Sequence, residues 1–142
     1  MKALTLAFAF LLAGSTAAVA QTYTLTEIGR PCHADLTGQL AQLPQGQGIR
    51  FGLRSRQPNA LAVLVIGDRA PSPVALPGGP CQLFVDPRAT MLSTTDANGD
   101  AAFGFRVPPV LPIRILFQGV VVDVTPSGRR AAATDVIRLT GQ

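Results

Sequence analysis

Glycine and proline interrupt this chain so often that it has little room for a long helix. Twelve prolines and fourteen glycines are spread along its 142 residues. Proline removes a backbone donor and clashes with the preceding helical turn, and glycine in a helix interior costs about 1 kcal/mol relative to alanine. The segments between these residues are short and rich in valine, leucine, isoleucine and phenylalanine, which is the composition of β-strands. We therefore expect an all-β fold.

Apolar residues recur at every second position in several of these segments, which is the pattern of a strand with one buried and one exposed face. One such strand contains Ile49, Phe51 and Leu53, and three more are predicted at Cys81, Leu83 and Val85, at Ala101, Phe103, Phe105 and Val107, and at Ile113, Ile115 and Phe117. Residues 61–66 are apolar at both parities, so they predict a central strand covered on both faces. The last predicted strand spans residues 135–140.

Turn-forming residues separate the predicted strands at regular intervals. Short strands and turns in this rhythm predict one antiparallel β-sandwich, Ig-like or jelly-roll-like, of about seven to nine strands over residues 21–142. Residues 67–80 resemble a loop that covers a sheet edge. Near Gly119 the apolar parity changes from Ile115 and Phe117 to Val120 and Val122, and we expect a β-bulge at this glycine to explain the change.

The first twenty residues have the form of a cleaved signal peptide. Lys2 precedes an apolar run over residues 3–13, and small residues lead to an A-x-A-type cleavage site at residues 18–20. The run is shorter than the ~20 residues of a membrane-spanning helix. Ser15 stands where a lipoprotein signal carries its lipid-bearing cysteine. We expect an apolar signal-peptide helix over residues 1–20 and a secreted or periplasmic mature chain without a membrane span.

The chain has two cysteines, Cys32 and Cys81. In an exported chain two cysteines outside any C-x-x-C motif are most simply joined in a disulfide. The bridge closes a long loop, for which the chain-entropy model gives about 4 kcal/mol of stabilisation. We expect it to tie the N-terminal segment to the strand that begins at Cys81.

Several segments resemble a group of exported bacterial β-sandwich proteins with one disulfide and no assigned activity. The resemblance rests on residues 29–32 (GRPC), 76–87 (LPGGPCQLFVDP), 93–108 (STTDANGDAAFGFRVP), 116–123 (LFQGVVVD) and 136–141 (VIRLTG). It covers most of the chain between Cys32 and Leu139. It implies the fold and export, and it implies no activity.

A row of arginines is the first candidate ligand site. Arg50 and Arg54 alternate with the apolar residues of the strand around Phe51, and Arg56 follows in the same parity. Guanidinium groups about 7 Å apart along one face bind the sulfate, phosphate or carboxylate groups of an extended polyanion. An ordinary solvated sheet face is the alternative. Nucleic acid is not expected as a partner, because no aromatic platform accompanies the row.

Two other clusters of polar residues are weaker candidates for a functional site. Asp96, Asn98 and Asp100 have the oxygen spacing that opens calcium loops, but glycine and glutamate are missing from the positions that an EF-hand requires. Asn98-Gly99 instead predicts a tight type I′ turn at the head of a two-stranded hairpin. His33 and Asp35 could pair as imidazole and carboxylate, yet no serine elbow or set of zinc ligands accompanies this only histidine of the chain.

These patterns predict a non-catalytic exported protein with a structural or adhesive role and no cofactor. The alternative is a module that binds an anionic polysaccharide or envelope polymer through the arginine face, and a hydrolase is a remote third reading. The formal net charge of +4 bears on solubility and non-specific association rather than on a specific partner.

Overall fold

The computed structural model describes residues 21–142. The predicted signal peptide, residues 1–20, lies outside the described residues. Eight strands follow one another: β1 (Tyr23–Ile28), β2 (Ala34–Leu43), β3 (Gly46–Ser55), β4 (Leu61–Ala75), β5 (Gln82–Thr94), β6 (Asp100–Arg106), β7 (Ile113–Thr125) and β8 (Gly128–Gly141). Within residues 21–142 no helix is long and apolar enough to cross a membrane.

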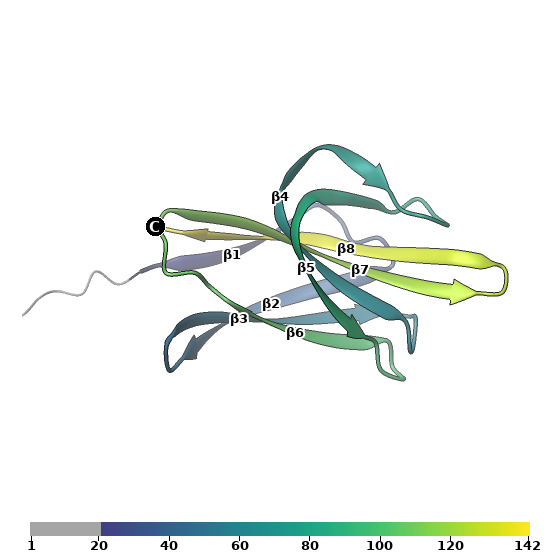
Figure 1. The fold of residues 1–142 in the computed structure, drawn as a ribbon, viewed down its shortest axis with the longest axis horizontal. Helices are drawn as coiled ribbons and strands as arrows, with labels where there is room; N and C mark the ends of the chain where they lie inside the picture. Colours follow the sequence, from purple (N-terminus) through teal and green to yellow (C-terminus); the bar gives the residue numbers. More distant parts are fainter. Residues whose placement is uncertain (1–20) are drawn as a thin grey trace, which may run out of the picture.

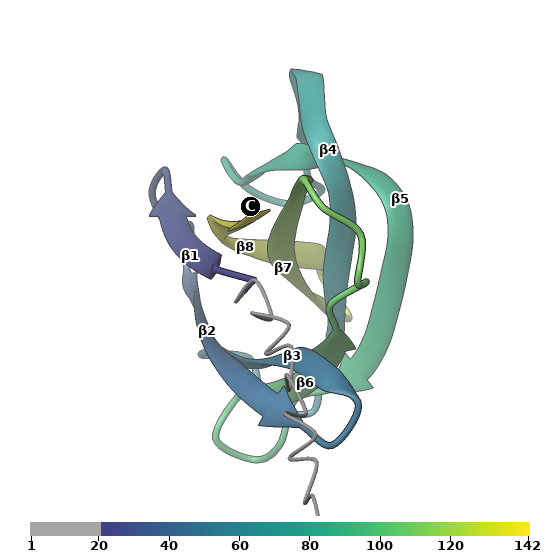
Figure 2. The same ribbon diagram turned by 90° about the vertical axis from the view of Figure 1, so that its left-hand side faces the viewer.

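The strands form two antiparallel sheets that pack face to face (Figures 1 and 2). One sheet has five strands in the order β1-β8-β7-β4-β5, and the other has three in the order β2-β3-β6. The predicted all-β antiparallel sandwich is therefore confirmed. Sequence patterns did not predict β1 or β2. In the structure β1 pairs with β8 along its whole length.

The main core fills the space between the two sheets. Ile49, Phe51 and Leu53 on β3 are at most 2% exposed, as the alternation in their segment predicted. Phe117 of β7 packs on Phe51 with ring centroids 4.7 Å apart, and Phe105 of β6 meets Phe117 edge-on at 5.1 Å. Such tilted pairs add roughly 0.5–1.5 kcal/mol to the burial of the rings.

A second apolar cluster lies on the opposite face of the five-stranded sheet. The end of β4, the start of β5 and the connection between them, residues 68–87, form an arm that curls over β7 and β8 (Figure 1). Beneath the arm, Val65, Leu116, Val120 and Val136 pack with Val85 of the arm itself. The prediction that residues 67–80 form a loop over a sheet edge is wrong, because β4 continues to Ala75 and the arm covers a sheet face. The strand over residues 61–66 is covered on both faces as predicted, except that Leu61 is 46% exposed.

The predicted bulge at Gly119 is displaced onto the neighbouring strand. The pairing of β7 with β8 shifts between Gln118 and Val120, where Thr134 and Asp135 of β8 face the single residue Gly119. The extra residue therefore belongs to β8, and the two faces of β7 do not exchange. Val120 is apolar because it is buried in the second cluster, on the opposite face of the sheet from Phe117. Burial of both faces therefore produced the same apolar pattern as an exchange of faces would.

The predicted Asn98-Gly99 hairpin is also corrected. The chain does turn here, with a hydrogen bond of 3.1 Å from the Gly99 amide to the Asp96 carbonyl, but β5 and β6 belong to different sheets and do not pair. Gly99 has a φ of +85°, whereas Asn98 keeps a negative φ, so this is not a type I′ turn. The turn carries the chain from one layer of the sandwich to the other.

Candidate functional site

Most polar candidates of the sequence, though not Arg50 or Asp96, meet in one hollow of about 900 Å³ at an end of the sandwich. Its lining comes from four separate segments: residues 31–35, the end of β3 with the residues after it, the turn between β5 and β6, and the start of β8. The charged or titratable side chains among them are His33, Asp35, Arg54, Arg56, Asp100 and Arg130. Three guanidinium groups thus face two carboxylates, and the hollow has a positive formal charge.

Cross-strand pairing fixes the floor of the hollow. Arg54 of β3 lies opposite Asp35 of β2 on one side and opposite Asp100 of β6 on the other. Its Nε lies 3.3 Å from the Asp100 Oδ1, with both side chains well exposed. An exposed pair of this kind contributes between 0 and about 1 kcal/mol, so it orients Arg54 more than it stabilises the fold.

The other two arginines of the hollow are in no ion pair among residues 21–142, although Asp123 of β7 lies opposite Arg130 in the strand pairing. Arg56 lies just beyond the end of β3, and Arg130 lies near the start of β8. Both are exposed, and within the described part of the chain neither forms an ion pair. These two guanidinium groups therefore keep all their donors for solvent or a ligand.

The arginine row of the sequence divides between two places. Arg50, Arg54 and Arg56 are all exposed, as the alternation predicted. Arg54 and Arg56 line the end hollow, but Arg50 lies opposite Gly104 on the outer face of the three-stranded sheet. There it lines a smaller hollow of about 280 Å³ with Arg106. The sequence placed the three side chains on one face of a strand, but β3 ends before Arg56, and Arg50 lies apart from the end hollow that Arg54 and Arg56 share.

His33 and Asp35 line the same hollow without forming a hydrolytic pair. His33 has a φ of +67°, a left-handed conformation that is uncommon in any residue with a side chain. Ser55 is the serine in the lining, and it is buried. Its hydroxyl donates to the Gly99 carbonyl at 3.1 Å and accepts from the Gln57 amide at 3.2 Å. These bonds hold the serine in a structural position rather than that of a nucleophile.

The Asp96 carboxylate is engaged by its own turn. Its Oδ1 accepts the backbone amides of Asn98 at 2.8 Å and of Asp100 at 3.0 Å. The hydrogen bonds from Asp100 and then Asn98 lower the pKa of Asp96. The oxygen spacing that suggested calcium therefore serves to brace the loop, as local aspartate bonds to following amides commonly do.

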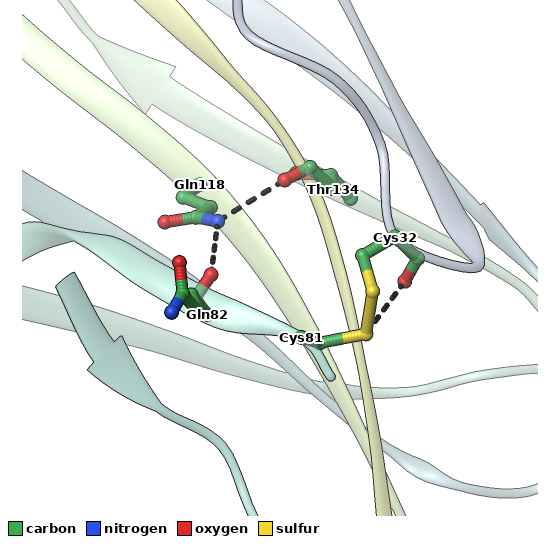
Figure 3. The surroundings of a disulfide bond; sticks show 5 residues. All are labelled: Cys32, Cys81, Gln82, Gln118 and Thr134. Carbon is green, nitrogen blue, oxygen red and sulfur yellow. Dashed lines mark hydrogen bonds between the residues drawn. A yellow bond between two sulfur atoms is a disulfide. The ribbon is translucent and has the colours of Figure 1, made fainter. Parts of the chain in front are cut away.

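The predicted disulfide between Cys32 and Cys81 is present, with the Cα atoms 5.6 Å apart (Figure 3). It fastens the tip of the arm, just before β5 begins, to the segment before β2. A disulfide is consistent with an oxidising compartment such as the periplasm or the cell exterior.

Beside the disulfide a buried glutamine holds the arm to the sheet. Gln118 is fully buried, and its Nε2 donates to the carbonyls of Gln82 at 3.0 Å and Thr134 at 3.1 Å (Figure 3). Its Oε1 accepts the Phe84 amide at 2.7 Å. Phe84 lies where the pairing of β4 with β5 is interrupted, so this side chain replaces a missing strand partner.

Two further lining residues were not identified from the sequence. Arg130 follows a predicted turn, and only the pairing of β8 with β7 places it at the hollow. Gln57 lines this hollow and an adjoining one of about 330 Å³, whose wall includes Gly78 and Gly79 of the arm. The Gln57 Oε1 is buried without a hydrogen-bond partner in the described structure. A basic residue beside a turn was the sole sequence signal for Arg130.

No family model, curated protein or solved structure matches this chain. The residues and geometry of the hollow are therefore the basis for proposing a function.

Proposed function

We propose that this chain is an exported, non-catalytic module that adheres to an anionic polymer of the cell envelope or its surroundings. The observation that carries the proposal is the convergence of Arg54, Arg56 and Arg130 on one open hollow. Arginine suits this role because its planar fork makes paired hydrogen bonds to carboxylate, sulfate and phosphate groups.

The shape of the surface favours an extended ligand over a single small anion. The end hollow shares Arg54, Asp35 and Asp100 with a smaller one of about 480 Å³ on the outer face of β3. It shares Arg130 and Gln57 with the hollow beside the arm. A chain lying along this track meets guanidinium groups at intervals, as a polysaccharide with acidic sugars requires.

The remaining polar groups fit a ligand that also carries hydroxyls. Asn98 and Asp100 offer acceptors at the rim, next to the arginine donors. Sugar hydroxyls donate and accept hydrogen bonds, so they match such a mixed lining. The proposal involves no hydrolysis, and it fits the position of Ser55, whose hydroxyl is engaged by the Gly99 carbonyl and the Gln57 amide.

The test is calorimetric titration with oligogalacturonate, a chain of uronic acids. One variant replaces all three arginines of the hollow with glutamine, and a matched variant removes equal charge elsewhere by replacing Arg69, Arg114 and Arg129. We expect the first variant to lose at least about threefold in affinity, since each exposed charged contact contributes about 0.2–1 kcal/mol. The matched variant should lose much less, and binding by the parent should weaken as salt is raised.

Three outcomes would count against the proposal. One is equal loss in the two triple variants, which would reduce binding to net charge. Another is a loss for Arg50→Gln as large as for Arg56→Gln, which would move the site from the hollow to the sheet face. Absence of binding to oligogalacturonate, sulfated oligosaccharide and polyphosphate alike would reject an anionic ligand altogether.

A further inference from the structure

The disulfide stands next to the only histidine of the chain. The sulfurs of Cys32 and Cys81 and a ring nitrogen of His33 all lie within 4.8 Å of one another. Metals bind thiolates, so the two sulfurs are not effective ligands while they are bonded to each other. We propose that reduction of this disulfide converts the cluster into a Cys₂His site for a thiophilic cation such as Zn²⁺.

The chemistry needs a reductant and releases protons. A dithiol, or a phosphine in vitro, supplies two electrons, the S–S bond breaks, and each cysteine sulfur takes up a proton. The dithiol becomes a disulfide, or the phosphine becomes a phosphine oxide with oxygen from water. When Zn²⁺ binds, both cysteine protons leave and two Zn–S bonds form, while neutral His33 donates a nitrogen lone pair.

Hydrogen bonds independent of the disulfide hold Cys32 in place. Its amide donates to the Ala133 carbonyl at 2.7 Å, and its carbonyl accepts the Ala133 amide at 2.9 Å. These bonds attach the segment before β2 to β8, whether or not the bridge is present.

Cys81 is held from the other side. Its carbonyl accepts the Leu76 amide at 2.9 Å, and the neighbouring Gln82 carbonyl accepts from Gln118. The Cys81 sulfur is 3.2 Å from the Cys32 carbonyl oxygen, which offers an acceptor to the reduced thiol (Figure 3). The two cysteines therefore stay adjacent when the S–S bond is cut.

The local geometry suits a tetrahedral ion. Two Zn–S bonds of about 2.3 Å at a tetrahedral angle separate the sulfurs by about 3.8 Å. Side-chain rotation can supply this separation across a Cα–Cα distance of 5.6 Å. His33 is exposed, so its imidazole is accessible from solvent and water can take the fourth position of the ion. The left-handed backbone of His33 is a strained conformation of the kind found at ligand sites.

The test compares oxidised and reduced protein. The chain is reduced with a phosphine, freed of reductant without oxygen, and titrated with Co²⁺ and with Zn²⁺. We expect one ion per reduced chain, with the intense visible absorption of tetrahedral thiolate-bound Co²⁺, and no such signal from the oxidised chain. His33→Asn removes the imidazole, and asparagine tolerates the left-handed backbone at this position. It should weaken Zn²⁺ binding at least about tenfold, since loss of groups that merely support metal ligands already costs 10–100-fold.

Three results would overturn the inference. The first is that the reduced chain binds no ion. The second is that His33→Asn binds Zn²⁺ as tightly as the parent, which would remove the histidine from the site. The third is unfolding of the reduced chain by circular dichroism before metal is added, since the cysteines would then not be held together.

Discussion

Replacing Gln118 with methionine should release the arm from the sheet. Methionine has a similar shape and preserves packing, but it can make none of the three hydrogen bonds of the glutamine. The Phe84 amide and the carbonyls of Gln82 and Thr134 would each lose a partner, in contacts that are buried or partly buried. Neutral bonds contribute about 1 kcal/mol each, and unpaired buried groups cost 1–3 kcal/mol. The free energy of unfolding should therefore fall by about 2–4 kcal/mol.

Urea denaturation measures the loss, and amide hydrogen exchange locates it. Exchange at Phe84 should accelerate more than exchange at Phe51 in the main core, because the arm opens without the rest of the sandwich. Gln39→Met, on the exposed face of β2, is the matched control and should change stability by less than about 0.5 kcal/mol. A loss for Gln118→Met no larger than that of the control would refute the argument that this side chain holds the arm.

Three other predictions concern stability. Joint replacement of Cys32 and Cys81 by alanine should lower the free energy of unfolding by up to about 4 kcal/mol, because the bridge closes a loop of 49 positions. Denaturant titrations measure this loss, and an unchanged unfolding midpoint would contradict the prediction. Gly99→Ala should lower the melting temperature, because a Cβ at φ +85° would collide with the Ser55 carbonyl oxygen; equal melting temperatures would show that the turn has another conformation. Burial raises the pKa of Asp135, so the folded state binds its proton more tightly and stability falls as pH rises from 3.8 through the raised pKa. Asp135→Asn should therefore melt higher than the parent at pH 7 and lose this advantage below pH 3.8; a constant difference would argue against it.

Local sequence patterns predicted the strands that bury one face. Ile49, Phe51 and Leu53 alternate with polar residues because only one side of β3 meets the core, and period-two burial leaves a direct trace in the sequence. The start of β8 left no such trace. Ala131, Ala132 and Ala133 are small residues buried on both faces, and three alanines in a row favour no period.

The second cluster explains why β7 was misread. An apolar residue at the wrong parity has two causes, an inserted residue or burial of both faces, and the sequence does not distinguish them. Val120 is buried under an arm whose position depends on a disulfide and on Gln118, contacts between residues far apart in the chain. The same reason applies to Arg130, which reaches the hollow through the pairing of β7 with β8.

The individual site residues were visible in the sequence, but their meeting place was not. His33, Asp35, Arg54 and Asn98 were each singled out by type and spacing, in three unconnected arguments. Antiparallel pairing of β2 with β3 and of β3 with β6 brings them to one end of the sandwich. Strand order is set by long-range packing, so a single sequence does not reveal it.

The central claim is that the end hollow binds an anionic chain, and residue-level mapping by NMR tests it most directly. Isotope-labelled protein would be titrated with hexameric oligogalacturonate while backbone and guanidinium signals are followed. The account predicts that the largest changes occur at His33, Arg56 and Arg130, with smaller ones at Arg50 and none at Arg88 beside the arm. Changes centred on the arm or on the outer face of the five-stranded sheet, or no changes at all, would contradict it.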